Sequence, residues 1–172
     1  KDTSMVKINN NDEINAIKKI LGLEVNKKYT DRKEIEKKLR YGKILFMTDQ
    51  DLDGAHIKGL GINLFDSQWP ELIEVNDFIG FMNTPIIKIT HGKKVISFYN
   101  ETDYNTWKEN NDIKGWKVKY YKGLGTSTAK EFKEYFKEKK IIHFNYEDIS
   151  CRKSLDLVFN KKRADDRKKW LG

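Results

Sequence analysis

Residues 43–54 read Lys43-Ile44-Leu45-Phe46-Met47-Thr48-Asp49-Gln50-Asp51-Leu52-Asp53-Gly54. The apolar run in this segment predicts a short buried β-strand that ends where the carboxylates begin. Alternate residues of an extended segment point the same way, so we expect Asp49, Asp51 and Asp53 to converge just beyond the strand end. Three carboxylates at one place repel each other. A hard cation such as Mg²⁺ would hold them together, because it prefers oxygen ligands.

The acidic segment has two other interpretations. The pattern Asp-x-Asp-x-Asp-Gly matches the first half of an EF-hand calcium loop. That loop needs Glu at its twelfth position, which here is Leu60, and a helix before it, where residues 43–47 predict a strand. The segment could also be a solvated acidic turn, since turns favour Asp. A strand-end site in an open α/β sheet fits better, because ligands of such sheets bind at the carboxyl ends of the strands.

The composition favours a soluble protein with a polyanionic partner. Of the 172 residues, 38% are hydrophobic and 35% are charged, and the formal net charge is +8, although a general lysine bias would give the same excess. Cys151 is the only cysteine, which excludes an internal disulfide and a cysteine-cluster zinc site. Without a membrane-length apolar run or a signal peptide, we expect an intracellular protein with no membrane partner. The ends at Lys1 and Gly172 are expected to be cuts in a longer polypeptide.

Helical spacing and capping residues predict helices on both sides of the strand. A polar cluster at 9–12 caps a helix that ends at Gly22, and Asp31 with Glu34 starts a second helix in a capping-box pattern. After the acidic segment, a third helix is expected to run to Trp69-Pro70. The residues expected on one face of that helix are Ile57, Leu60, Gly61 and Leu64.

The second half of the chain is expected to be richer in strands. The expected elements are a β-hairpin at 84–89 and 95–99, a short helix at 100–109, and strands at 116–121 and 141–146. Asp148 can cap a final helical region that becomes strongly basic. The residues expected to face inward there are Cys151, Leu155 and Val158.

A glycine-rich loop, Lys122-Gly123-Leu124-Gly125, follows the predicted strand at 116–121. Backbone amides of such a loop at a helix N-terminus bind anions, and Lys122 adds a positive charge, although many such loops are only turns. Thr128 and Glu131 predict a capping box at the start of the next helix. The buried stripe expected on that helix consists of Ala129, Phe132 and Phe136.

These segments together resemble one family. Residues 48–59, Thr48-Asp49-Gln50-Asp51-Leu52-Asp53-Gly54-Ala55-His56-Ile57-Lys58-Gly59, resemble the Asp-x-Asp-x-Asp part of the Toprim domain of type IIA DNA topoisomerases. Residues 119–127, Lys119-Tyr120-Tyr121-Lys122-Gly123-Leu124-Gly125-Thr126-Ser127, are similar to the glycine loop of the eukaryotic type, topoisomerase II. Residues 84–88 and 165–171 agree as well, so the resemblance covers nearly the whole chain. The bacterial gyrase B protein is similar at the first motif, but its glycine loop continues without Thr126-Ser127-Thr128.

The resemblance implies an α/β fold. Its centre is a Toprim-type (Rossmann-like) parallel sheet that is flanked by helices and lacks its first strand. A β-rich tail and a basic helical linker follow the sheet. The implied segments are 1–40, a helical insertion of the Toprim region; 41–82, the Toprim core with the acidic motif; 83–147, the β-rich tail with the glycine loop; and 148–172, the linker toward a breakage-reunion domain outside this sequence.

The implied function is that of an ATP-dependent type IIA topoisomerase, which cleaves double-stranded DNA, passes a second duplex through the break and religates it. In that family the Toprim carboxylates hold one or two Mg²⁺ ions beside the scissile phosphate. Transferred by motif, Asp49 would contact both metal positions, Asp51 would hold the second, and Asp53 would shape the site through water.

The resemblance also implies the partners. Arg167, Lys168 and Lys122 are the implied DNA-binding residues, with Asp165 and Asp166 able to orient Arg167 by pairing with it. Double-stranded DNA is the expected substrate and the parent enzyme is expected to be a homodimer in the nucleus. ATP would be used by a domain outside this sequence.

Two groups of the family's reaction are not in this sequence. The Toprim glutamate of a Glu-Gly-Asp-Ser stretch would lie upstream of Lys1, and the nucleophilic tyrosine downstream of Gly172, so the isolated chain is not expected to be active. Ala55 replaces a serine common in the family, which should spare the carboxylates. The alternatives are a non-catalytic DNA-binding module whose acidic loop holds calcium, and another Toprim enzyme: the gyrase B protein, a nuclease or a primase. Neither of the last two is expected to carry the 122–125 loop.

Overall fold

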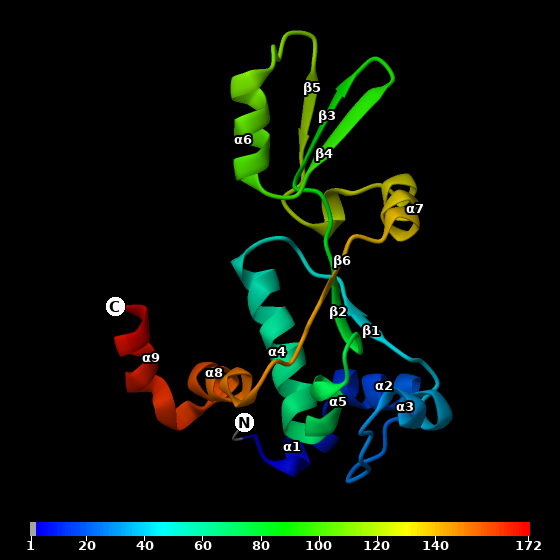
Figure 1. Ribbon diagram of the computed structural model, residues 1–172, viewed down its shortest axis with the longest axis vertical. Helices are drawn as coiled ribbons and strands as arrows, with labels where there is room; N and C mark the ends of the chain where they lie inside the picture. Colours follow the sequence, from blue (N-terminus) through cyan, green and yellow to red (C-terminus); the bar gives the residue numbers. More distant parts are fainter. Residues whose placement is uncertain (1–2) are drawn as a thin grey trace. The chain divides into compact units, whose positions relative to one another are not determined.

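The computed structural model describes residues 3–172, so residues 1–2 of the expected helical insertion lie outside the described residues. The chain divides into two compact units. The first unit consists of the chain up to residue 45 together with 59–80 and 143–172, and the second unit consists of 46–58 and 81–142. Figure 1 labels the helices and strands of both units.

The mixed α/β class expected from the sequence is confirmed. The described elements are, in order, α1 (Met5–Asn9), α2 (Asp12–Leu21), α3 (Arg32–Lys38), β1 (Ile44–Phe46), α4 (Leu52–Gln68), α5 (Pro70–Glu74), β2 (Ile79–Met82), β3 (Ile87–His91), β4 (Lys94–Phe98), α6 (Glu101–Asn110), β5 (Lys117–Tyr120), the 3₁₀-helix η1 (Leu124–Thr126), α7 (Ala129–Glu138), β6 (Ile141–His143), α8 (Ile149–Phe159), the 3₁₀-helix η2 (Lys161–Arg163) and α9 (Ala164–Leu171). Within the described residues, the strands form two three-stranded sheets, ordered β1-β2-β6 and β4-β3-β5.

The helices of the first unit begin and end where their capping residues predict. The Asn11 side chain accepts the N–H of Ile14 at the start of α2, and Gly22 ends that helix with a φ of 78°. Glycine favours this left-handed conformation because it has no Cβ. The Asp31 side chain accepts the Glu34 N–H at the start of α3. Both predicted helices are therefore confirmed.

Aromatic residues form the core of the first unit. The Phe65 ring lies 5.9 Å from that of Trp69 and 5.8 Å from that of Phe78, and all three side chains are buried. Trp69 Nε1 donates a hydrogen bond to the Glu24 carbonyl over 2.9 Å, which satisfies its buried donor. As predicted, α4 ends just before Trp69, and Pro70 opens α5, because proline fits the first turn of a helix.

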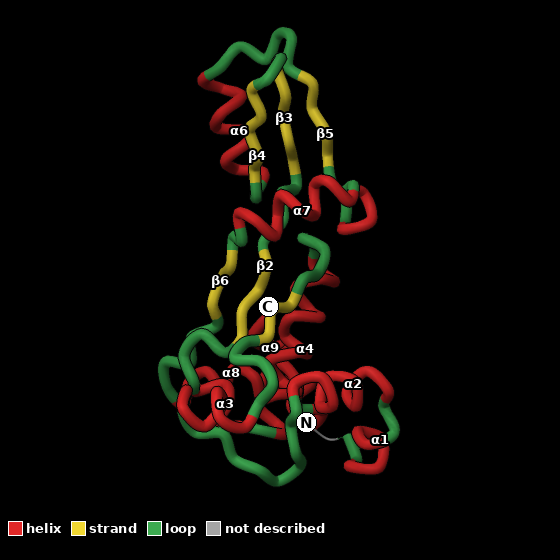
Figure 2. The backbone as a smooth tube through the Cα atoms, turned by 90° about the vertical axis from the view of Figure 1, so that its right-hand side faces the viewer, coloured by secondary structure: helices red, strands yellow, loops and turns green. Residues whose placement is uncertain are grey.

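The second unit is built on the predicted hairpin. β3 lies between β4 and β5 and pairs antiparallel with both. The turn between β3 and β4 begins with Gly92, whose φ of 58° suits the first position of a two-residue hairpin turn. Helix α6 lies beside this sheet in both views (Figures 1 and 2), where Tyr104 packs with Ile89 and Phe98 in a small core.

Three expected helix faces differ from the structure. On α4, Gly61 is buried and Leu64 is half-buried, but Ile57 and Leu60 are 51% and 45% exposed. On α7, Phe136 is 52% exposed and Tyr135 is buried in its place. Ala129 is exposed and Phe132 is half-buried. The reason is that Glu131 and Tyr135, one helical turn apart, both make polar contacts with the segment before α7.

The third difference concerns α8. Cys151 and Leu155 are only half-buried and Val158 is exposed, so α8 has no fully buried residue. The helix is instead attached by Arg152. Its Nε donates to Asp66 Oδ1 over 3.1 Å, and its Nη2 donates to the Pro70 carbonyl over 2.9 Å and lies 2.7 Å from Glu74 Oε1.

Arg152→Ala should destabilise the first unit by about 2–4 kcal/mol, because the Asp66 side chain is only 4% exposed and would lose its cation. The free energy of unfolding from urea denaturation measures the loss. Lys153→Ala on the exposed side of α8 is the matched control and should change it by less than about 0.5 kcal/mol. Equal losses in the two variants would contradict the assignment of Arg152 as the anchor of α8.

Candidate functional site

The acidic turn connects β1 to α4. The Gly54 N–H donates to Asp51 Oδ1 over 2.7 Å, and the Ala55 N–H donates to the Asp51 carbonyl over 3.0 Å. Asp51 therefore caps α4, as aspartate does at many helix N-termini. The buried Thr48 hydroxyl donates to the Gly54 carbonyl over 3.2 Å and closes the turn from the other side.

The extended geometry expected for all three carboxylates is wrong. The chain turns into α4 at Leu52, so Asp53 lies in the first helical turn and the alternation of side chains ends at Asp51. Within residues 3–172, no group of three or more His, Cys, Asp or Glu side chains is arranged to hold a metal ion. The EF-hand interpretation fails as predicted, because strand β1 and not a helix precedes the loop.

Gly54 is required by the tightness of this turn. A Cβ atom at this position would lie 1.9 Å from the Asp49 carbonyl oxygen. Backbone atoms cannot move out of the way as a flexible side chain can. The glycine at the end of the acidic motif is thus explained by the backbone that must pass close to it.

The structure brings the acidic motif and the glycine loop together inside the second unit. The Leu124 N–H donates to Asp49 Oδ1 over 2.6 Å, although the two residues are 75 positions apart. A Cβ atom on Gly123 would lie 2.7 Å from Asp49 Oδ2, so the missing side chain is what admits the carboxylate. One amide of the loop, that of Leu124, thus binds a carboxylate of the chain itself. Lys122 is exposed at the start of the loop.

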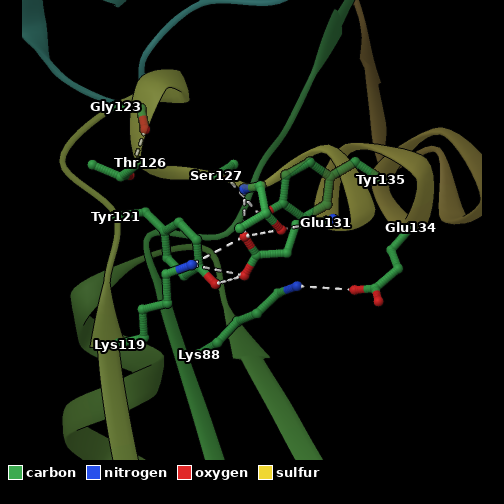
Figure 3. A network of polar contacts seen from close by, with 10 residues as sticks. Lys88, Lys119, Tyr121, Gly123, Thr126, Ser127, Glu131, Glu134 and Tyr135 are labelled. Atoms are coloured by element: carbon green, nitrogen blue, oxygen red, sulfur yellow. Dashed lines mark hydrogen bonds and ion pairs between the residues drawn. The ribbon is translucent and has the colours of Figure 1, made fainter.

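A polar network holds the ends of this loop (Figure 3). Glu131 of α7 accepts hydrogen bonds from the Tyr121 hydroxyl, from Lys119 Nζ over 3.0 Å and from the Thr128 N–H over 2.7 Å. The Thr128 hydroxyl in turn accepts the Glu131 N–H, so the predicted capping box is confirmed. The sequence indicated only this helix cap, and missed that the same carboxylate also binds the strand on the other side of the loop.

The hydrogen bonds determine the charge states in the network. Burial raises the pKa of Glu131, but the donors from Thr128, Tyr121 and Lys119 outweigh it and lower the pKa to about 2. Burial, followed by the contact with Glu131, raises the pKa of the Tyr121 hydroxyl above its usual value. At neutral pH the network therefore consists of an ionised acceptor and a protonated donor.

The ligand chemistry of Asp49 and Asp51 suits a hard cation. Asp49 and Asp51 supply two carboxylates from one turn, and one oxygen of each is oriented by a backbone amide. Mg²⁺ is commonly bound by one or two carboxylates, with waters and substrate phosphates completing its shell. Two carboxylates therefore suffice for a site that is completed by a phosphate.

The basic tail differs in detail from the expectation. Asp166 pairs with Arg163 over 2.8 Å and Asp165 with Lys168 over 3.4 Å, so the expected pairing of these aspartates with Arg167 is wrong. Arg167 Nη1 donates instead to the Leu157 carbonyl over 3.0 Å and to the Asn160 carbonyl over 2.7 Å. The Arg167 guanidinium thus fastens α9 to the end of α8, while the side chain of Lys168 is 80% exposed.

The fold and the acidic turn define a TOPRIM-associated α/β protein. Residues 82–172, more than half of the chain, match the family model described as the C-terminal associated domain of TOPRIM, and the chain belongs to this family. Within the described part of the chain, no helix is both long and apolar enough to cross a membrane.

The similar proteins are eukaryotic type II topoisomerases. The chain is 47% identical to DNA topoisomerase 2 top-2 of Caenorhabditis elegans and 48% identical to DNA topoisomerase 2 of Arabidopsis thaliana, each over 99% of its own length. It spans only 11% and 12% of those relatives. The crystal structure of the Plasmodium falciparum topoisomerase II DNA-binding, cleavage and re-ligation domain matches with a TM-score of 0.89 and 45% identity, over 99% of this chain and 23% of that one. The resemblance drawn from the sequence is confirmed.

Gly123→Ala should break the contact between the loop and Asp49, because the new Cβ would collide with the carboxylate. We expect a loss of about 0.5–1.5 kcal/mol in the free energy of unfolding, the contribution of one typical hydrogen bond. Gly125→Ala is the matched control, since nothing lies within 4 Å of a Cβ at that position. Thermal unfolding of both variants measures the difference. A Gly125→Ala variant as unstable as Gly123→Ala would refute the steric argument.

Proposed function

We propose that this chain supplies the metal-binding carboxylates for DNA cleavage in a eukaryotic-type, type IIA DNA topoisomerase. The hydrogen bond from Leu124 to Asp49 carries the proposal, because it joins the acidic motif and the glycine loop in one site. The relatives that share nearly the whole sequence are DNA topoisomerase 2 by name, and the similar crystal structure is that of a DNA-binding, cleavage and re-ligation domain.

The residues would act as follows. Asp49 would bind at both metal positions and Asp51 at the second, while Asp53, in the first turn of α4, would shape the site through water. Mg²⁺ bound there would neutralise charge on the scissile phosphate and stabilise the leaving ribose oxygen. Lys122, exposed at the start of the loop, would contact a DNA phosphate. The nucleophilic tyrosine and the Toprim glutamate would come from other parts of the longer protein.

The proposal extends to the fold and the partners. The sheet β1-β2-β6 would belong to a parallel, Rossmann-like Toprim sheet flanked by helices. Residues 1–40 would be its helical insertion, 41–82 its core, 83–147 the β-rich tail and 148–172 the basic linker. Double-stranded DNA would be the substrate, which the formal net charge of +8 supports. A second copy would complete a homodimer in the nucleus, and ATP would be hydrolysed by a separate domain.

Asp49→Asn and Asp51→Asn in the full-length protein should each lower Mg²⁺-dependent DNA cleavage by about 100-fold or more, which corresponds to about 3 kcal/mol of transition-state stabilisation. Asparagine can still accept the Leu124 amide and can still cap α4, so the change isolates the charge. The covalent protein–DNA adduct formed on a supercoiled plasmid measures cleavage. Asp112→Asn, in an exposed loop, is the control.

Two results would contradict the assignment of Asp49 and Asp51 to DNA cleavage. Adduct formation at the wild-type rate in both variants would remove the carboxylates from the chemistry. A wild-type protein that binds duplex DNA but forms no adduct with Mg²⁺ would favour the non-catalytic module. Melting curves of each variant must match the wild type for either result to count.

The basic tail yields a separate prediction. Lys168→Gln should leave the melting temperature unchanged and reduce the salt slope of duplex binding by about 0.9, because one phosphate contact is lost. Arg167→Ala should lower the melting temperature, because its guanidinium binds two carbonyls at the end of α8. Lys93→Gln in the exposed hairpin turn is the control for both. An unchanged salt slope for Lys168→Gln would leave that lysine on a solvated face.

A further inference from the structure

We propose that Glu131 is a positioning residue for the Asp49 carboxylate and acts through the glycine loop. This inference rests on the proposed function, because the carboxylate it positions is the proposed metal ligand. Glu131 does not touch Asp49. Glu131 binds the two ends of residues 121–128, as the contacts with Tyr121 show in Figure 3. The Leu124 N–H in the middle of this segment binds Asp49.

The first step is closure of the loop ends. Tyr121 precedes the loop and donates its hydroxyl to Glu131 Oε1, while Thr128 follows the loop and donates its N–H and its hydroxyl to Oε2 over 2.7 and 2.9 Å. The two oxygens of one carboxylate therefore hold the entry and the exit of the loop. Hydrogen bonds to an ionised acceptor are about twice as strong as neutral ones, and the Glu131 side chain is only 15% exposed.

The second step is the short path inside the loop. The Thr126 hydroxyl donates to the Gly123 carbonyl over 2.6 Å, and the Ser127 N–H donates to the Leu124 carbonyl over 3.1 Å. These bonds form η1 and leave the Leu124 N–H pointing outward to Asp49. Only a few residues separate the loop ends that Glu131 binds from the Leu124 amide that binds Asp49.

The third step is the effect on the loop when Glu131 no longer binds its ends. A loop with two glycines has many conformations available, so its order depends on bonds that fix its ends. Freed at its entry, the loop would present the Leu124 amide to Asp49 for only part of the time. A metal ligand whose supporting hydrogen bond is lost typically binds its metal about 10–100-fold more weakly.

A simpler role for Glu131 is capping of α7 alone, and two variants separate the roles. The double variant Lys119→Met/Tyr121→Phe removes both donors before the loop, because Lys119 Nζ also donates to Glu131, and it leaves the Thr128–Glu131 capping box intact. Glu131→Gln weakens both contacts. Glu134→Gln is the control on the same helix, because Glu134 pairs with Lys88 and does not contact the loop.

The experiment measures two quantities in the full-length protein. The first is hydrogen exchange of the Leu124 amide, which reports its bond to Asp49 directly. It should be about tenfold faster in Lys119→Met/Tyr121→Phe and in Glu131→Gln, and unchanged in Glu134→Gln. The second is the MgCl₂ concentration that gives half-maximal cleavage. It should rise by about tenfold in the same two variants, with a smaller change in the rate at saturating Mg²⁺.

Each outcome decides the inference. Unchanged Leu124 exchange in Lys119→Met/Tyr121→Phe overturns it and leaves Glu131 as a helix cap. Faster exchange with an unchanged Mg²⁺ requirement also overturns it, since the loss of order in the loop would then have no consequence for the ligand. If the wild-type protein shows no Mg²⁺-dependent cleavage, the proposed function fails, and the exchange data alone decide whether Glu131 positions Asp49.

Discussion

The candidate site depends on one hydrogen bond, from the Leu124 amide to the Asp49 carboxylate over 2.6 Å. It is the point at which the acidic turn and the glycine loop meet. Asp49 also accounts for two glycines: a Cβ on Gly123 would displace its carboxylate, and a Cβ on Gly54 would collide with its backbone carbonyl. The network around Glu131 then makes sense as support for the loop that provides the amide.

Four carboxylates of this unit form two contrasting pairs. Glu131 and Glu134 are paired with Lys119 and Lys88. Asp49 and Asp51, by contrast, accept hydrogen bonds from backbone amides. A neutral amide orients a carboxylate without cancelling its charge, whereas a lysine does both. A carboxylate that is oriented by an amide keeps its charge for a cation. A carboxylate that is paired with lysine is suited to structural support.

Two arginines of the first unit, Arg152 and Arg167, attach helices to neighbouring segments as well as carrying charge. Arg152 binds a buried carboxylate, a carbonyl and a second carboxylate, and Arg167 binds two carbonyls at the end of α8. The planar guanidinium suits such multiple contacts better than a lysine ammonium does. In a chain of net charge +8, the cations available for a polyanion are therefore fewer than the composition indicates, and Lys168 is one of the exposed ones.

The sequence by itself determined the local structure. Caps such as Asn11 and Thr128, the stop at Gly22 and the hairpin at Gly92 act within a few residues, so their prediction needed no distant partner. Tertiary structure decided the rest. Asp53 entered a helix because Asp51 caps α4, Phe136 turned outward because Glu131 and Tyr135 bind the preceding segment, and Arg167 bound carbonyls that its neighbours in sequence do not reveal. Which anion the glycine loop holds was equally beyond the sequence, because Asp49 lies 75 residues away and only the folded chain brings the two together.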